Sequence, residues 1–174
     1  SETTGLDPRI HEVISLALVI LDPETLLQEV RRVWYLLPRW LEEAEPEALK
    51  ANGFSRESWE ARGPVTHREA FEEFASLSSG CIFIAHNVSF DRAFVEAELT
   101  RQDLSWRGDY HFIDTASMFF TKYRRGEIQK LSLSHLCDHY GVNNKGAHDA
   151  LVDVDRMIEV FRELVREERL SHEH

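Results

Sequence analysis

Residues 12–21 read EVISLALVIL, and this nearly continuous apolar run is the stretch from which the fold is worked out. Its length and its Val and Ile content are typical of a strand buried on both faces. Asp22-Pro23 then marks a turn. The next run, LLQEVRRVWYLL over 26–37, carries arginines and aromatics that fit an outer strand paired with the first, although the period alone also allows a helix.

Downstream of this hairpin, helical and strand patterns alternate. Thr66-His67-Arg68-Glu69 forms a capping box that begins a helix. Helices are also predicted over 46–52, 90–99, 116–123 and 132–140, and short strands over 81–85 and 110–113. The final helix has the clearest apolar stripe, formed by Ala150, Leu151, Val154, Met157, Ile158, Phe161, Leu164 and Val165. Strands followed by alternating helix and strand predict an α/β fold with a mixed sheet.

The size and composition predict one soluble domain. The chain has 174 residues, of which 43% are hydrophobic and 29% charged, so 1–174 is expected to form a single compact domain. It shows neither a signal peptide nor an apolar run of about 18 residues. We therefore expect a cytoplasmic protein without a membrane partner.

The net charge of -11 is unusual for a protein that binds nucleic acid, because phosphates are normally contacted by Lys and Arg. Divalent metals held by carboxylates supply positive charge locally, so the acidity does not exclude such a ligand. One basic cluster, Lys122-Tyr123-Arg124-Arg125 with Lys130 nearby, fits either a phosphate grip or a solvated helix end.

Three short acidic segments are candidates for chemistry. The first is SETTGL at positions 1–6, where Glu2 precedes small hydroxyl residues and Gly5, a residue that lets a ligand approach the backbone closely. Taken alone, such a segment is more often a polar surface turn.

The second segment is HNVSFD over 86–91, directly after the predicted strand 81–85. Asp91 therefore lies at the carboxyl edge of the sheet, where open α/β folds bind ligands. A carboxylate that stabilises the helix dipole explains Asp91 equally well.

The third segment is HDALVD over 148–153, at the start of the last helix. At about 100° per residue, Asp149 and Asp153 share a face, while His148 projects away unless it precedes the first turn. In isolation, a solvated acidic face is the favoured interpretation.

Together these segments resemble the DnaQ-like exonucleases, a family with four acidic residues and a histidine. The similarity runs through SETTGLDP, HEVISLALV, PEALKANG, IAHNVSFDRAFVEAEL, IDTASMF, LSLSHLCDHYGV and HDALVDVDRMIEVF, nearly the whole chain. The resemblance implies a ribonuclease-H-like fold, a five-stranded mixed sheet flanked by helices. It also implies metal-dependent removal of nucleotides from a 3′ end.

The resemblance carries over to individual residues. Glu2, Asp91 and Asp153 would hold two Mg²⁺ or Mn²⁺ ions, and His148 would be the general base. The remaining positions would contact the substrate: Thr3, Thr4, Gly5 and Leu6 would line the 3′-terminal nucleotide, and His86, Asn87 and Phe90 would border the same pocket.

The chain departs from the family at its first motif, which should read Asp-x-Glu. The aspartate belongs directly before Ser1, and the strand expected upstream is also missing. We therefore expect that the sequence is truncated at its N-terminus and that the first strand lies outside it. The rival interpretation is an inactive copy that has lost a metal ligand.

The sequence thus predicts a 3′-to-5′ exonuclease that releases nucleoside 5′-monophosphates from single-stranded or frayed DNA ends. A non-catalytic nucleic-acid-binding or scaffold module is one alternative, and an exonuclease for short RNA is another. A polymerase, another protein or a fused domain is a further expected partner. Ribose and deoxyribose are distinguished by local geometry, which the sequence does not display.

Overall fold

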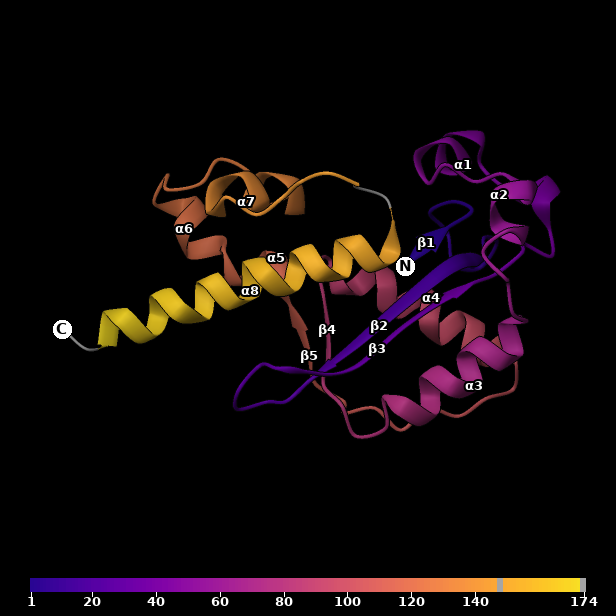
Figure 1. Cartoon of the computed structure of the whole chain (residues 1–174), viewed down its shortest axis with the longest axis horizontal. Coiled ribbons are helices and arrows are strands. Elements are labelled where there is room, and N and C mark those ends of the chain that lie inside the picture. Colours follow the sequence, from indigo (N-terminus) through magenta and orange to yellow (C-terminus); the bar gives the residue numbers. More distant parts are fainter. Residues whose placement is uncertain (147–148, 173–174) are drawn as a thin grey trace.

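The computed structural model describes residues 1–146 and 149–172, and Figure 1 shows them. The first sheet is antiparallel, in the order β1-β2-β3, with strands β1 (Glu2–Thr3), β2 (Val13–Leu21) and β3 (Gln28–Tyr35). The apolar run is a strand, as predicted, and it is the central strand of this sheet. The following run is the outer strand and not a helix, because its residues pair with β2 from Ser15 to Leu21.

A second sheet is parallel and joins β4 (Phe83–Ala85) to β5 (Phe112–Asp114). The described residues thus form five strands and the expected mixed α/β fold. One detail of the expectation was wrong: within residues 1–146 and 149–172 the strands form two separate ladders. The two-residue β1 pairs with β2 alone, so it does not join the ladders.

The predicted helices are present, with two differences in detail. The helix expected over 116–123 is two helices that break at the fully buried Phe119. A short helix over 56–60, capped by Ser55, was not predicted, because its five residues, RESWE, show no apolar periodicity. The helical elements are η1 (Leu41–Glu43), α1 (Pro46–Ala51), α2 (Arg56–Glu60), α3 (His67–Leu77), α4 (Val88–Arg101), α5 (Thr115–Met118), α6 (Phe120–Arg124), α7 (Leu133–Tyr140) and α8 (Ala150–His172).

Two apolar clusters hold these elements together. The larger packs β2 and β3 against α3 and α4, with Phe71 and Phe94 fully buried. The smaller packs α7 against α8 around Leu136 and Val160. Helix α8 also packs against β2 of the antiparallel sheet, and its first turn lies near β1 (Figure 1). In the described part of the chain, no helix is both long and apolar enough to span a bilayer.

A buried ion network ties the first twelve residues to α4. The Glu12 carboxylate, 1% exposed, accepts hydrogen bonds from Nε of Arg39 at 2.5 Å and from the Arg39 and Trp40 backbone at 2.8 Å. Arg39 also donates to both oxygens of the fully buried Glu98 at 2.9 Å. Arg101 completes the network by donating to Glu98 at 2.7 Å and to the carbonyl of Pro8 at 2.5 Å.

We predict that His67, which lies against this network, makes the fold sensitive to acid. Burial lowers the pKa of His67; the negative charges of Glu98 and Glu12 and the bond to the Val13 carbonyl oppose this effect, and Arg39 reinforces it. The unfolded chain then binds a proton more readily than the folded one, so stability is lost as pH falls below about 6.5. Urea midpoints at pH 7.5 and 5.5 measure the loss.

His67→Gln is the matched variant, since it keeps a polar side chain without a titrating group. Between the two pH values, the free energy of unfolding of this variant should fall less than that of the unsubstituted protein. The difference between the two falls should be at most about 1.4 kcal/mol per pH unit, the value for one bound proton. An identical pH dependence in the variant would contradict this role for His67.

Candidate active site

Three carboxylates from distant segments meet at the start of α8. Glu2 comes from β1, Asp91 from the first turn of α4 and Asp153 from the first turn of α8. Burial raises the pKa of Glu2 to about 7; the Ser1 ammonium opposes this effect, and the charges of Asp153, Asp91 and Asp149 add to it. The predicted convergence of the three acids is therefore present in the structure.

The Asp91 carboxylate faces the first residues of the chain. The Ser1 hydroxyl donates to Oδ1 of Asp91 at 2.9 Å. Carboxylate oxygens are the ligands that hard divalent cations prefer, so Glu2, Asp91 and Asp153 have the chemistry of a Mg²⁺ or Mn²⁺ site.

Asp91 is placed by the turn between β4 and α4. Asn87 adopts a left-handed conformation with φ of 67°, which turns the chain directly from strand into helix. Its backbone N–H donates to the Asp114 carboxylate at 2.9 Å, and the same oxygen accepts from the Ala116 N–H. Sequence reasoning missed Asp114, although its position directly at the end of a strand was a usable signal.

Asp153 is held by an arginine of its own helix. Arg156, 5% exposed, donates from Nη1 to Oδ1 of Asp153 at 2.6 Å and from Nη2 to the side chain of Asn144. This contact was also missed in the sequence. The i,i+3 spacing of an acid and an arginine on one helix was its only signal.

Asp149 begins α8. Its Oδ1 accepts from the N–H groups of Leu151 and Val152, and its backbone carbonyl accepts from the N–H of Asp153 at 2.9 Å. The helix start that carries Asp153 is thereby fixed. The predicted general base, His148, lies outside the described residues, so its role stays a prediction.

The predicted nucleotide-lining turn contains both exposed and buried residues. Leu6 is 73% exposed and free to meet a ligand, whereas Thr4 is 1% exposed and accepts from the Glu12 N–H at 2.9 Å. The Thr3 hydroxyl donates to the Gly5 carbonyl at 2.7 Å. A Cβ at Gly5 would lie 2.5 Å from the His11 ring, so this glycine is also required for packing within the turn.

The other residues predicted to border this pocket also differ in their exposure. His86 bonds through Nδ1 to the Thr115 hydroxyl at 3.0 Å and through Nε2 to the Leu131 carbonyl at 2.8 Å, and burial lowers its pKa. A neutral ring that donates from Nε2 satisfies both partners. Asn87 is exposed, while Phe90 is half-buried against Phe94 at a ring separation of 4.9 Å.

A second acidic group has the composition of a metal site. Ligand atoms of Glu12, His67 and Glu98 lie within 4.8 Å of one another, and all three residues are buried. However, both oxygens of each carboxylate already accept from Arg39, Trp40 or Arg101, and Nε2 of His67 faces the Val13 carbonyl at 3.1 Å. An arginine supplies the positive charge there, so we assign this group to stability.

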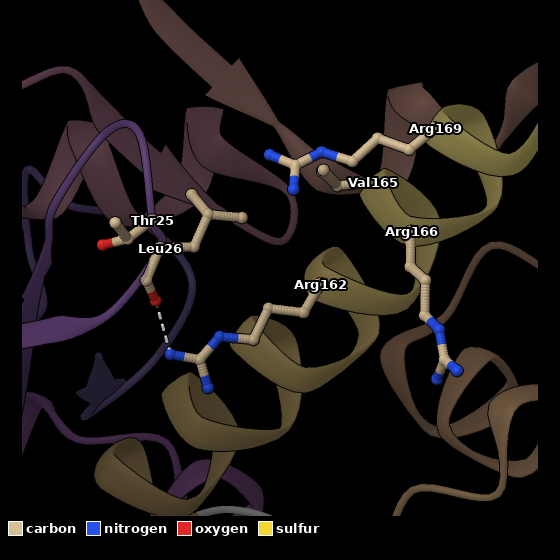
Figure 2. Close-up of a pocket in the computed structure, with 6 residues that line it drawn as sticks. All are labelled: Thr25, Leu26, Arg162, Val165, Arg166 and Arg169. Atoms are coloured by element: carbon tan, nitrogen blue, oxygen red, sulfur yellow. Dashed lines mark hydrogen bonds between the residues drawn. The ribbon is translucent and has the colours of Figure 1, made fainter. Parts of the chain in front are cut away.

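Two other basic features lie away from the carboxylates. Lys122 is 2.8 Å from Glu167 of α8, and this contact favours the helix-end interpretation of the basic cluster. A cavity of about 350 Å³ separates the turn after β2 from α8. There Arg162 donates to the Leu26 carbonyl (Figure 2). None of the three carboxylates lines this cavity.

Comparison with known proteins identifies the family. An exonuclease family model (RNase_T) matches residues 1–161. The chain belongs to the exonuclease family. It is 30% identical over 183 residues to Ribonuclease T of Shewanella denitrificans, covering 94% of this chain and 77% of that protein. The Ribonuclease T of Shewanella sp. strain ANA-3 is 33% identical over 179 residues, covering 94% and 78%.

Solved structures show the same fold. E. coli Exonuclease I in complex with a dT13 oligonucleotide superposes with a TM-score of 0.82 at 23% identity, covering 98% of this chain. Exonuclease I of Methylocaldum szegediense gives 0.79 at 25% identity and 95% coverage. The exonuclease-family chain spans 41% of the E. coli protein and 39% of the Methylocaldum protein.

These comparisons confirm four predictions from the sequence. The chain is DnaQ-like, has the ribonuclease-H-like fold and is a nuclease hydrolase of a metal-dependent family. The solved structures of E. coli Exonuclease I include complexes with dT13 and dA16 oligonucleotides. The individual site residues are not tested by these matches and are proposals below.

We predict that Glu2→Gln stabilises the metal-free exonuclease and removes its response to metal. Above pH 7 the substitution removes the cost of burying the charged Glu2 carboxylate, which should raise Tm by about 2–4 °C for each kcal/mol gained. Millimolar Mg²⁺ or Mn²⁺ should raise Tm of the unsubstituted protein by mass action, and this shift should largely vanish in the variant. Thermal melts with chelator or metal measure both effects.

Glu29→Gln, on the exposed start of β3, is the control and should keep the metal-induced shift. A full metal-induced shift in Glu2→Gln would remove Glu2 from the ligand set.

Proposed function

We propose that this exonuclease removes nucleotides from the 3′ ends of single-stranded or frayed DNA and releases nucleoside 5′-monophosphates. The observation that carries the proposal is the convergence of Glu2, Asp91 and Asp153 in one acidic pocket, in a chain of the exonuclease family. The three carboxylates share a site in which burial raises the pKa of Glu2 to about 7, and such perturbed pKa values are concentrated at functional sites.

The three carboxylates would hold two Mg²⁺ or Mn²⁺ ions, which supply an acidified water and offset the charge of the departing oxygen. An aspartate directly before Ser1, as in the family motif, would complete the ligand set. His148 would accept the proton of the attacking water. The new oxygen–phosphorus bond replaces the bond to the 3′ oxygen of the shortened strand, and that oxygen takes up a proton.

A groove along α4, the helix that also carries Asp91, supports a single-stranded substrate. A cavity of about 390 Å³ lies between α4 and the residues leading into β5, lined by Val88, Ser89, Arg92, Ala93, Glu96, Tyr110 and Phe112. Tyr110 is 79% exposed and Phe112 is 52% exposed, and the Arg92 guanidinium lies 4.8 Å from the Phe112 ring centre. Exposed aromatics beside a cation bind unpaired bases and their phosphates.

Short RNA is the second candidate substrate, and a specific observation favours it. The curated relatives of highest similarity reported above are named Ribonuclease T. Sugar identity depends on contacts to a 2′-hydroxyl, so a direct comparison of substrates is needed.

The deciding assay uses 5′-labelled single-stranded DNA and RNA of the same sequence, with Mg²⁺ or with chelator. It is run on the 174-residue chain and on a chain extended by an aspartate before Ser1. We expect stepwise shortening from the 3′ end only with metal. Cleavage at internal positions, or shortening that persists in chelator, would overturn the proposal.

His148→Ala should reduce kcat by about 100-fold or more, because the general base is lost, while folding and most metal binding remain. His139→Gln on α7, away from the carboxylates, is the matched control and should retain full turnover. Unchanged turnover in His148→Ala would remove His148 from the mechanism.

Tyr110→Ala should raise KM for a single-stranded oligonucleotide by about tenfold, because a stacking surface for one base is lost. Tyr123→Ala removes an exposed tyrosine of α6 and serves as the control. Equal KM values for the two variants would contradict the placement of the strand in the groove.

A further inference from the structure

Arg62, which follows α2, presents a cation at the edge of the acidic pocket. Its guanidinium carbon lies 4.6 Å from the Tyr35 ring centre and 5.0 Å from the Trp59 ring centre. Nη1 is 3.3 Å from Oδ2 of Asp149, the residue that begins α8. No role for Arg62 was visible in the sequence, because its partners are separated from it along the chain.

The sheet register places this arginine on the side of the sheet that carries the candidate metal ligands. Glu2 pairs with Ser15, and Ser15 pairs with Tyr35 on its other side. Residues directly opposite one another across a sheet share a face. Two strand spacings amount to about 10 Å, so the ring beneath Arg62 lies within reach of the nucleotide next to one bound at Glu2.

The aromatic support under Arg62 is rigid. Trp59 is 3% exposed, donates from Nε1 to the Ile14 carbonyl at 2.7 Å and packs edge-on against Tyr35 at 5.8 Å. The Arg62 N–H donates to the Trp59 carbonyl at 3.0 Å. A guanidinium held in this way loses little conformational entropy when it binds a ligand.

The donors of Arg62 are largely uncommitted. Its side chain is 41% exposed, and the contact at 3.3 Å to Asp149 is long for a hydrogen bond between charged groups. Asp149 does not depend on Arg62, since its other oxygen caps α8. In contrast, Arg39, Arg101 and Arg156 each donate to a carboxylate within 2.5–2.9 Å.

We propose that Arg62 binds a phosphate of the nucleic-acid strand beside the scissile bond and that Asp149 occupies its guanidinium when no strand is bound. This inference rests on the proposed function and adds a substrate-binding residue to it. The planar fork of a guanidinium matches two phosphate oxygens. In a chain with net charge -11, a stacked arginine beside the site is suited to hold the strand.

The exchange of partners predicts opposite effects of two substitutions. Arg62→Gln removes the phosphate contact, so Kd for an oligonucleotide should rise about tenfold. Asp149→Asn removes the competing charge but keeps an oxygen for the helix cap, so Kd should fall by about threefold. If Arg62 only held α8 in place, both substitutions would weaken binding.

The experiment measures fluorescence anisotropy of a 5′-labelled deoxythymidine strand of about 12 nucleotides. Ca²⁺ replaces Mg²⁺ to limit hydrolysis, and binding is followed over a range of salt concentrations. For Arg62→Gln, the slope of log K against log salt should become shallower by about 0.7, the value for one phosphate contact on a single strand. Arg62→Lys keeps the charge and should restore most of the slope.

Arg56→Gln is the matched control, because Arg56 lies on α2, the short helix that Arg62 follows, and pairs only weakly with Glu60 at 3.8 Å. Its salt slope and Kd should be unchanged. An unchanged slope in Arg62→Gln, or weaker binding in Asp149→Asn, would overturn the role of Arg62 while leaving the exonuclease proposal intact. Absence of salt-dependent binding by the unsubstituted protein would overturn both.

Discussion

The burial of Glu2 beside Asp91 and Asp153 is the constraint on which the rest of this structure depends. Removal of the Glu2 carboxylate from water raises its pKa to about 7; the Ser1 ammonium opposes this effect, and the charges of Asp153 and Asp91 add to it. The elements that carry the acids must therefore be held together by contacts elsewhere. The apolar clusters supply most of that cohesion, and the network of Arg39 with Glu12 and Glu98 fixes the direction of the chain beside the site.

The arginines near the site divide into two kinds. Arg39, Arg101 and Arg156 are engaged with carboxylates and carbonyls at short distances, so they position the turn and the helices. Arg62 rests on an aromatic surface and has one long ionic contact. The first kind sets geometry, whereas the second retains the capacity to bind a phosphate.

The sequence predicted the fold well wherever local patterns decide it. The strand at 13–21, the capping box at Thr66 and the apolar stripe of α8 follow from residue spacing, and family resemblance brought the three acids together. The partners of Arg62 and Arg39 could not be predicted in this way. Asp149 is 87 positions from Arg62, and Glu98 is 59 from Arg39, so only the packed fold pairs them.

The division of the arginines into two kinds also explains how so acidic a chain can be an exonuclease. Positive charge engaged in internal ion pairs adds nothing to the attraction of a polyanion, so the cations that count are those a strand can reach. At the acidic site these are the proposed metal ions beside Glu2 and Arg62 above Tyr35, and Glu2 and Tyr35 are two strand spacings apart, about 10 Å. Net charge therefore describes the protein's long-range field, while the proposed binding of a 3′ end would be decided by the local order of carboxylate, metal and guanidinium.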